Sequence, residues 1–133
     1  EDALRNTLQS LRSLSLKRII TVFGCGGERD TLKRPKMGKV ASELSDFVII
    51  TNDNPRSENP EDIIKDITAG IKKDNYSVIY NRKEAIKSAL TMSKQGDIVL
   101  VAGKGHEKYQ ILKNKVVRFD DREEIARCLK SMN

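Results

Sequence analysis

The clearest strand of the chain is joined to one of its clearest helices by the stretch FVIITNDNPRSENP, residues 47–60. Residues 47–51 are apolar and mostly β-branched, which predicts a buried strand. The final Asn-Pro and the two acids after it predict a capped helix start. Asp53, Asn54 and Arg56 therefore lie between a strand and a helix, where open α/β folds bind ligands. The same residues also fit a simple polar turn.

Apolar periodicity predicts further strands and helices on both sides of this stretch. Helical spacing is found in residues 3–16, 35–45, 60–73, 81–94 and 120–131. Strand-like runs are residues 19–23, 47–51, 76–80 and 98–102, with a hairpin formed by 109–112 and 115–119. The alternation predicts a three-layer, Rossmann-like α/β fold, with a mostly parallel sheet of about six strands, a C-terminal β-hairpin and helices on both faces.

A chain of 133 residues with 38% hydrophobic and 33% charged residues is expected to fold as a single domain, residues 1–133. It has no apolar run near the roughly 18 residues of a membrane-spanning helix, and its first residues do not form a secretory signal. Cys25, Cys128 and the single histidine, His106, suggest neither a disulfide framework nor a metal site. We therefore expect a protein of the reducing cytoplasm.

The formal net charge of +6 invites an anionic partner, either a small molecule or a nucleic acid. Many lysines fall on helix faces that are expected to face solvent, and only three phenylalanines and three tyrosines are available to stack on bases. An anionic small molecule suits the charge equally well, and we expect no nucleic-acid partner.

Three loops follow the carboxyl ends of predicted parallel strands, at residues 24–34, 52–58 and 103–108. Because these ends lie along one edge of a parallel sheet, the loops are expected to converge on a binding site. The first loop starts like a dinucleotide-binding motif, but Arg29 stands where the third glycine would be. No stretch matches the phosphate loop G-x-x-x-x-G-K-[ST], so the chain by itself is not expected to hold a nucleoside triphosphate in that way.

The end of the first loop and the helix after it are rich in basic residues, namely Arg29, Lys33, Arg34 and Lys36. A cation at a helix N-terminus, which is already positive, costs about 0.3–1 kcal/mol unless an anion shares the site. The cluster therefore favours phosphate or carboxylate binding. The alternative is a solvated basic loop that Glu28 and Asp30 partly balance.

The other reactive side chains of these loops fit structural roles better than chemical ones. Cys25 is expected to be a small packing residue rather than a nucleophile. His106 is expected to be structural or exposed, since no second histidine or cysteine flanks it. Glu107 differs from both, because an acid close to two glycines can approach a bound amine closely.

Four motifs make the sequence specific: GCGGERD at 24–30, KRPKMG at 33–38, DNPR at 53–56 and GKGHEKYQ at 103–110. In this order and at these separations they closely resemble the carboxyl-terminal domain of the Mur ligases. Within that family the resemblance is strongest to the UDP-N-acetylmuramoyl-tripeptide synthetases that add meso-diaminopimelate. It covers essentially the whole chain, and residues 2–4 resemble the helix after the family's hinge. We therefore expect the chain to be one domain of a three-domain ligase.

The resemblance implies an ATP-dependent acid–amino-acid ligase of peptidoglycan synthesis, with roles in cell wall biogenesis, cell shape and cell division. ATP phosphorylates the terminal carboxylate of UDP-MurNAc-L-Ala-D-Glu, and the amine of meso-diaminopimelate attacks the acyl phosphate to form an amide. ATP and Mg2+ would be bound mainly by the central domain of the ligase. This chain alone is therefore expected to be inactive, with no catalytic residue and no metal ligand. The ligase is expected to be a monomer without a membrane or nucleic-acid partner.

Carried over position by position, the family's amino-acid pocket corresponds to Arg29, Asp53, Asn54, Pro55, Arg56, Gly103 and Glu107. Asp30 and Lys33 match a part of the pattern that approaches ATP on domain closure. Meso-diaminopimelate carries a second ammonium and carboxylate, remote from the reacting amine. The guanidinium forks of Arg29 and Arg56 can bind that carboxylate, and Asp53 and Glu107 can receive the ammonium.

The alternative function is a free-standing basic α/β module that binds a nucleotide or RNA. The gene upstream of Glu1 distinguishes the two functions. A phosphate loop encoded there supports the ligase, and a start codon near Glu1 supports the free-standing module.

Overall fold

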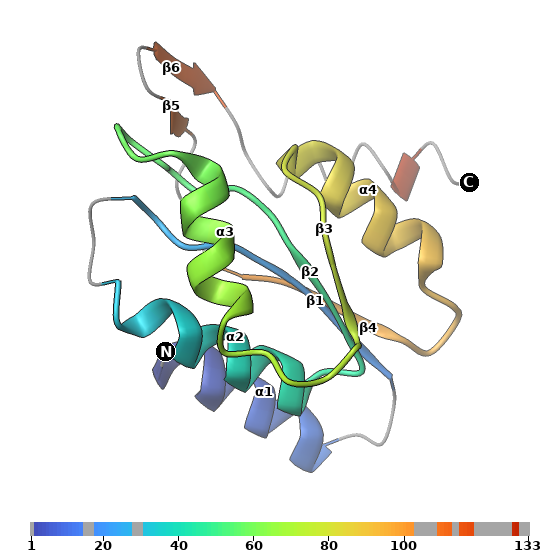
Figure 1. Cartoon of the computed structure of the whole chain (residues 1–133). Coiled ribbons are helices and arrows are strands. Elements are labelled where there is room, and N and C mark those ends of the chain that lie inside the picture. The colour runs from blue at the N-terminus through green and yellow to red at the C-terminus, as the bar shows by residue number, and fades with distance from the viewer. Residues whose placement is uncertain are drawn as a thin grey trace.

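The computed structural model describes residues 2–14, 18–27, 31–102, 109–112, 115–118 and 129–130 (Figure 1). Its helices are α1 (Asp2–Leu14), α2 (Lys33–Leu44), α3 (Pro60–Thr68) and α4 (Arg82–Met92). Its strands are β1 (Ile19–Phe23), β2 (Phe47–Ile50), β3 (Tyr76–Val78), β4 (Ile98–Val101), β5 (Tyr109–Leu112) and β6 (Lys115–Arg118). The predicted last helix lies mostly outside the described residues.

The main sheet is parallel, with the strand order β3-β2-β1-β4. Strands β5 and β6 pair antiparallel with each other as a separate sheet. The α/β class, the parallel sheet and the C-terminal hairpin are confirmed. Among the described residues, however, the parallel sheet has four strands rather than about six. Only residues 113–114 join β5 to β6, and so short a connection lets two strands satisfy each other's hydrogen bonds as a hairpin.

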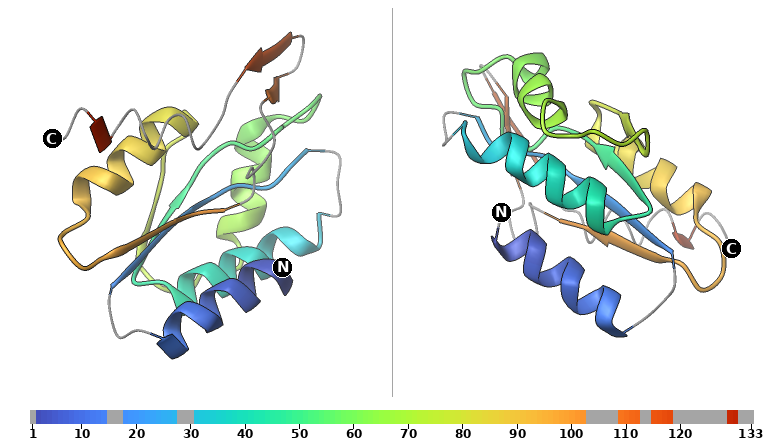
Figure 2. Two further views of the ribbon diagram at one scale, coloured as in Figure 1. Left: turned by 180° about the vertical axis from the view of Figure 1, so that it is seen from behind. Right: turned by 60° about the horizontal axis from the view of Figure 1, so that its bottom comes forward.

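Helices cover both faces of the sheet (Figure 2). The side chains of β1 and β2 alternate between two apolar cores, one beneath each layer of helices. The core beneath α1, α2 and α3 contains Leu4, Leu8, Ile19, Phe23, Val40, Ala41, Val48, Ile50, Ile63, Ile64 and Ile67. The core beneath α4 contains Ile20, Val22, Ile49, Ala85, Ile86, Ala89 and Leu90. The strands are therefore held from both sides, as the sequence predicts.

Helix α3 ends at Thr68, about five residues earlier than its apolar spacing suggests. Gly70 follows directly after the C-cap residue, and glycine disfavours the helical conformation. A Cβ at Gly70 would also lie 2.6 Å from the carbonyl carbon of Pro35 in α2. The turn after α3 thus packs backbone to backbone against α2, and only glycine fits there. Ile71 still packs partly buried against the core.

Asparagine caps begin both α3 and α4. The side chain of Asn59 accepts a hydrogen bond from the N–H of Glu61 at 2.9 Å. The side chain of Asn81 accepts one from the N–H of Glu84 at 3.0 Å. Such caps stabilise a helix by about 1 kcal/mol. The cap of α3 therefore fixes where the loop after β2 must end.

The carboxylate of Asp46 stabilises the edge of the sheet at which the strands begin. Asp46 accepts a hydrogen bond at 2.7 Å from the N–H of Ile19 and another at 2.7 Å from the guanidinium of Arg12 in α1. Partial burial opposes the ionisation of Asp46, but these hydrogen bonds outweigh it and lower the pKa of the carboxyl group. Ionised Asp46 therefore joins α1, β1 and the start of β2.

Candidate functional site

The loops after β1 and β2 emerge next to each other at one edge of the sheet (Figure 1). The N–H of Thr51, directly after β2, donates to the carbonyl of Phe23, the last residue of β1, at 2.9 Å. The structure therefore brings residues 24–27 and 52–58 together, as parallel strands require. The third loop of the predicted site, residues 103–108, lies outside the described residues.

Glycines allow the two loops to touch backbone to backbone. The N–H of Gly27 donates to the carbonyl of Asn54 at 2.7 Å. A Cβ at Gly27 would overlap the carbonyl oxygen of Pro55 and lie 2.5 Å from its carbonyl carbon. A Cβ at Gly24 would lie 3.1 Å from the backbone nitrogen of Asp53. Any side chain at either glycine would push the loops apart, so these glycines position the second loop.

The loop after β2 is folded back on itself by local hydrogen bonds. The carboxylate of Asp53 accepts from the N–H of Asn54 at 3.0 Å, and the carbonyl of Pro55 accepts from the N–H three residues later at 3.0 Å. Arg56 has a φ of 55°, a left-handed conformation that costs a non-glycine residue about 1–2 kcal/mol. Pro55 is buried, whereas the three polar residues are half-buried. The loop thus presents polar side chains on a constrained backbone.

Arg34, which was expected to help attract an anion, is buried inside the protein and paired there. Its side chain is 1% exposed and donates to the two carboxylate oxygens of Glu58 at 2.6 and 2.8 Å and to Asp66 at 2.9 Å. It also donates to the carbonyl of Gly26 at 3.1 Å. The hydrogen bond with Glu58 raises the pKa of Arg34 in spite of burial. The anion prediction is wrong for Arg34, because carboxylates distant in sequence neutralise it.

The contacts of Arg34 join three parts of the fold. Gly26 lies in the loop after β1, Glu58 lies in the loop after β2, and Asp66 lies in α3. One guanidinium therefore holds the two loops in a fixed relation to each other. Lys33, the first residue of α2, is exposed and stays available for a ligand.

Sequence reasoning missed a second buried arginine, Arg82, which is the first residue of α4. Its side chain is 1% exposed and donates to the carbonyl of Asn52 at 3.1 Å and to the carbonyl of Ala102 at 3.2 Å. The surrounding sequence, with Asn81 and Glu84, indicates the start of a helix and gives no signal of burial. Arg82 is a functional candidate that only the tertiary structure could reveal.

Cys25 is a packing residue, as expected. It is buried, and its thiol donates to the sulfur of Met37 at 3.5 Å. Burial raises the pKa of the Cys25 thiol to about 11, so the thiol stays protonated near neutral pH and is a poor nucleophile. His106 and Cys128 lie outside the described residues.

The structure describes part of the predicted site. Asp53, Asn54, Pro55 and Arg56 share one loop, and Lys33 lies at the start of α2. The other predicted residues, Arg29, Asp30, Gly103 and Glu107, lie outside the described residues.

Comparison with known proteins identifies the family to which the chain belongs. The family described as "Mur ligase, glutamate ligase domain" matches residues 1–105. The chain belongs to this family.

Two relatives of this Mur ligase domain and one solved structure carry the same ligase name. The chain is 54% identical, over 98% of its length, to the UDP-N-acetylmuramoyl-L-alanyl-D-glutamate--2,6-diaminopimelate ligase 1 of Clostridium acetobutylicum. It is 53% identical to the corresponding ligase of Clostridium botulinum, again over 98% of its length. A solved structure of a ligase of this name superimposes with a TM-score of 0.92 at 41% identity. The chain spans 27% of the length of each of these proteins.

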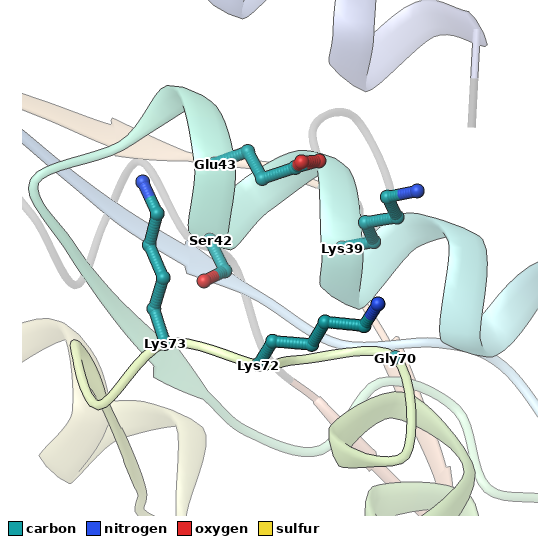
Figure 3. A pocket seen from close by; sticks show the side chains of 6 residues that line it. All are labelled: Lys39, Ser42, Glu43, Gly70, Lys72 and Lys73. Atoms are coloured by element: carbon teal, nitrogen blue, oxygen red, sulfur yellow. The ribbon is translucent and has the colours of Figure 1, made fainter.

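A pocket of the Mur ligase domain lies between α2 and the turn after α3 (Figure 3). It has a volume of about 240 Å³ and is lined by Lys39, Ser42, Glu43, Gly70, Lys72 and Lys73. None of the predicted site residues lines it.

The part of the chain that the structure describes contains neither a cluster of metal ligands nor a membrane-spanning helix. Within it, no three side chains of histidine, cysteine, aspartate or glutamate are grouped so that they could bind a metal ion. No helix in that part combines the length and the apolar composition that crossing a membrane needs.

Proposed function

We propose that the chain is the amino-acid-recognition domain of a larger ATP-dependent ligase, which adds meso-diaminopimelate to UDP-MurNAc-L-Ala-D-Glu in peptidoglycan synthesis. The observation that carries the proposal is the loop of Asp53, Asn54, Pro55 and Arg56, packed against glycines at the carboxyl edge of a parallel sheet. The names of the relatives support the same ligase rather than a free-standing nucleotide- or RNA-binding module.

The chemistry of the loop suits the remote end of meso-diaminopimelate. The guanidinium of Arg56 offers a planar pair of donors that matches a carboxylate, a geometry that an ammonium group cannot reproduce. Asp53 supplies a carboxylate for the remote ammonium group. The left-handed backbone of Arg56 and the burial of Pro55 hold these groups in place before the ligand arrives, which lowers the entropy cost of binding.

The rest of the proposed pocket comes from residues carried over by sequence. Arg29 would share the remote carboxylate with Arg56, and Glu107 would share the ammonium group with Asp53. Gly103 would allow the ligand to approach the backbone closely. Asp30 and Lys33 would lie near ATP when the domains of the ligase close.

The amide forms when the free amine of the amino acid attacks an acyl phosphate on the nucleotide precursor. The contribution of this domain is to position that amine, and such orientation can supply several kcal/mol of the barrier reduction. ATP and Mg2+ would be bound mainly outside this chain, because it has no phosphate-loop motif. The phosphorylation therefore belongs to other parts of the ligase. We expect the ligase to be a cytoplasmic monomer.

The test is steady-state kinetics of the full-length ligase with Arg56→Ala, at saturating ATP and nucleotide precursor. Leaving a buried charge partner unpaired costs roughly 2–5 kcal/mol, and half-buried Arg56 should fall near the lower limit. The catalytic efficiency with meso-diaminopimelate should therefore drop by about 30-fold. The poor activity with lysine, which has no remote carboxylate, should change little.

Two further variants make this test specific. Arg56→Lys keeps the charge but not the planar fork, and should recover only part of the lost efficiency. Lys87→Ala, on the exposed side of α4, is the matched control and should behave like the wild type. A wild-type preference for meso-diaminopimelate over lysine in Arg56→Ala would show that Arg56 is a turn residue.

A further inference from the structure

Arg82 is buried although the two lysines that follow it on α4 are exposed. Its side chain is 1% exposed, whereas Lys83 and Lys87 are on the surface. A guanidinium stays charged at every accessible pH, and burying a charge is costly unless hydrogen bonds compensate it. Arg82 also begins a helix, where the helix dipole is unfavourable for a cation. The position thus carries two electrostatic penalties.

Two backbone carbonyls in the described part of the chain accept hydrogen bonds from Arg82. The carbonyl of Asn52, 3.1 Å from Nη1 of Arg82, lies one residue before Asp53. The carbonyl of Ala102, 3.2 Å from Nη2, lies one residue before Gly103. Both partners therefore immediately precede a residue of the proposed amino-acid pocket.

The sheet itself does not join these two segments. Strands β2 and β4 lie on opposite sides of β1 and do not pair with each other. Hydrogen bonds to β1 hold β2 and β4 only up to the residue after each strand. For β4 this is Ala102, whose N–H donates to the carbonyl of Val22 at 2.8 Å. The side chain of Arg82 links the two segments directly beyond that point.

We propose that Arg82 is a positioning residue, whose hydrogen bonds to Asn52 and Ala102 hold the loop after β2 at a fixed separation from the end of β4, so that Asp53 is placed to bind the amino acid. The proposal rests on the proposed function, because it assumes that the loop after β2 binds meso-diaminopimelate. Arg82 acts through the backbone of Asn52 and Ala102.

The experiment compares Arg82→Met and Arg82→Lys with a matched control, Lys83→Met, in the full-length ligase. Methionine keeps an unbranched apolar side chain without the donors, and lysine keeps donors on a flexible stem. The first readout is the KM for each substrate, measured separately well below the melting temperature. The second is amide hydrogen exchange at residues 51–58 and 98–102, without ligand.

Arg82→Met should raise the KM for meso-diaminopimelate about tenfold or more, as expected for the loss of hydrogen bonds from a charged donor. The KM values for ATP and the nucleotide precursor should stay within about twofold of wild type, and residues 51–58 and 98–102 should both exchange faster. Arg82→Lys should recover part of the loss, and Lys83→Met should match wild type. If Arg82→Met does not fold, Arg82→Lys must show the same selective rise in KM to a smaller extent.

A purely structural role gives a different result. The melting temperature would then fall while all three KM values and the loop exchange stayed at wild-type values, and this would overturn the proposal. A wild-type enzyme that does not use meso-diaminopimelate would instead contradict the proposed function. In that case the exchange measurement still decides whether Arg82 couples the loop after β2 to the end of β4.

Discussion

Replacing Gly27 by alanine should separate the loops after β1 and β2. The new Cβ would lie 2.5 Å from the carbonyl carbon of Pro55, whereas ordinary contact begins at 3.4 Å. The loops must therefore move apart by at least 0.9 Å, because the new Cβ would also overlap the carbonyl oxygen of Pro55. The same movement would lengthen the 2.7 Å hydrogen bond from Gly27 to Asn54 beyond the roughly 3.2 Å limit of a good N–H···O bond.

The free-energy cost has two parts. An unsatisfied buried backbone group costs about 1–3 kcal/mol, and overpacking costs about 1–3 kcal/mol. Because the loops can relax, we expect a total loss of about 2–4 kcal/mol in the free energy of unfolding. The melting temperature should fall by on the order of 10 °C. The chain has no tryptophan, so unfolding in urea is best followed by far-UV circular dichroism.

The matched control is Gly96→Ala, which changes backbone strain without creating a close contact. Gly96 has a φ of 93°, and a Cβ at this position would meet no other atom within 4 Å. The substitution should therefore cost about 1 kcal/mol from backbone strain alone, and the KM for meso-diaminopimelate should not change. If Gly27→Ala is as stable as wild type and binds meso-diaminopimelate normally, the close packing of the two loops does not position the site.

Three further predictions concern stability. Because Arg56 has a positive φ, Arg56→Gly should be more stable to urea than Arg56→Ala by about 1 kcal/mol, while both lose meso-diaminopimelate selectivity. Arg34→Met should lower the free energy of unfolding by about 2–3 kcal/mol, less than for a fully buried pair, since Glu58 is 26% exposed; the added change Glu58→Gln should recover part of it. For Asp46, the lowered pKa means that its stabilisation is present above the unfolded-state pKa of about 3.9 and is lost as the pH falls through the lower folded-state pKa. Asp46→Asn should therefore lose less stability than wild type between pH 6 and pH 2 in urea titrations.

Each of these predictions has an outcome that contradicts it. Equal stability of Arg56→Gly and Arg56→Ala would mean that the backbone at Arg56 is not strained. No change in Arg34→Met would mean that the pair with Glu58 is worth no more than a surface ion pair. An Asp46→Asn curve parallel to wild type would mean that Asp46 has the same pKa in the folded and unfolded states.

The elements of the fold could be predicted because their signals are local. The β-branched run at 47–51 and the alternation of strands and helices are enough to predict a parallel α/β sheet. The helix starts at Asn59 and Asn81 were equally clear, since each cap acts within three residues. The end of α3 was less clear, because apolar spacing continues to Ile71 while packing of Gly70 against α2 limits the helix.

The candidate site could be predicted only where its residues form a motif. Asp53 and Arg56 stand in one loop at the end of a strand, so their common location follows from sequence alone. The roles of Arg34 and Arg82 could not be predicted in the same way. Arg34 meets Asp66 across 32 residues of sequence, and Arg82 meets Asn52 across 30. A basic residue looks the same in sequence whether it faces solvent or holds two loops together.

During synthesis on the ribosome, one edge of β1 stays unpaired until β4 has been made. Ile98 of β4 pairs with Ile19 of β1, 79 residues earlier in the chain. At the usual elongation rates, β1 waits on the order of 4–16 s for this neighbour, and an unpaired strand edge is prone to aggregation during that time. The bond between Arg82 and the carbonyl of Ala102 cannot form earlier either. Protection of this edge of β1 and formation of the Arg82 link should therefore coincide, once β4 has been made.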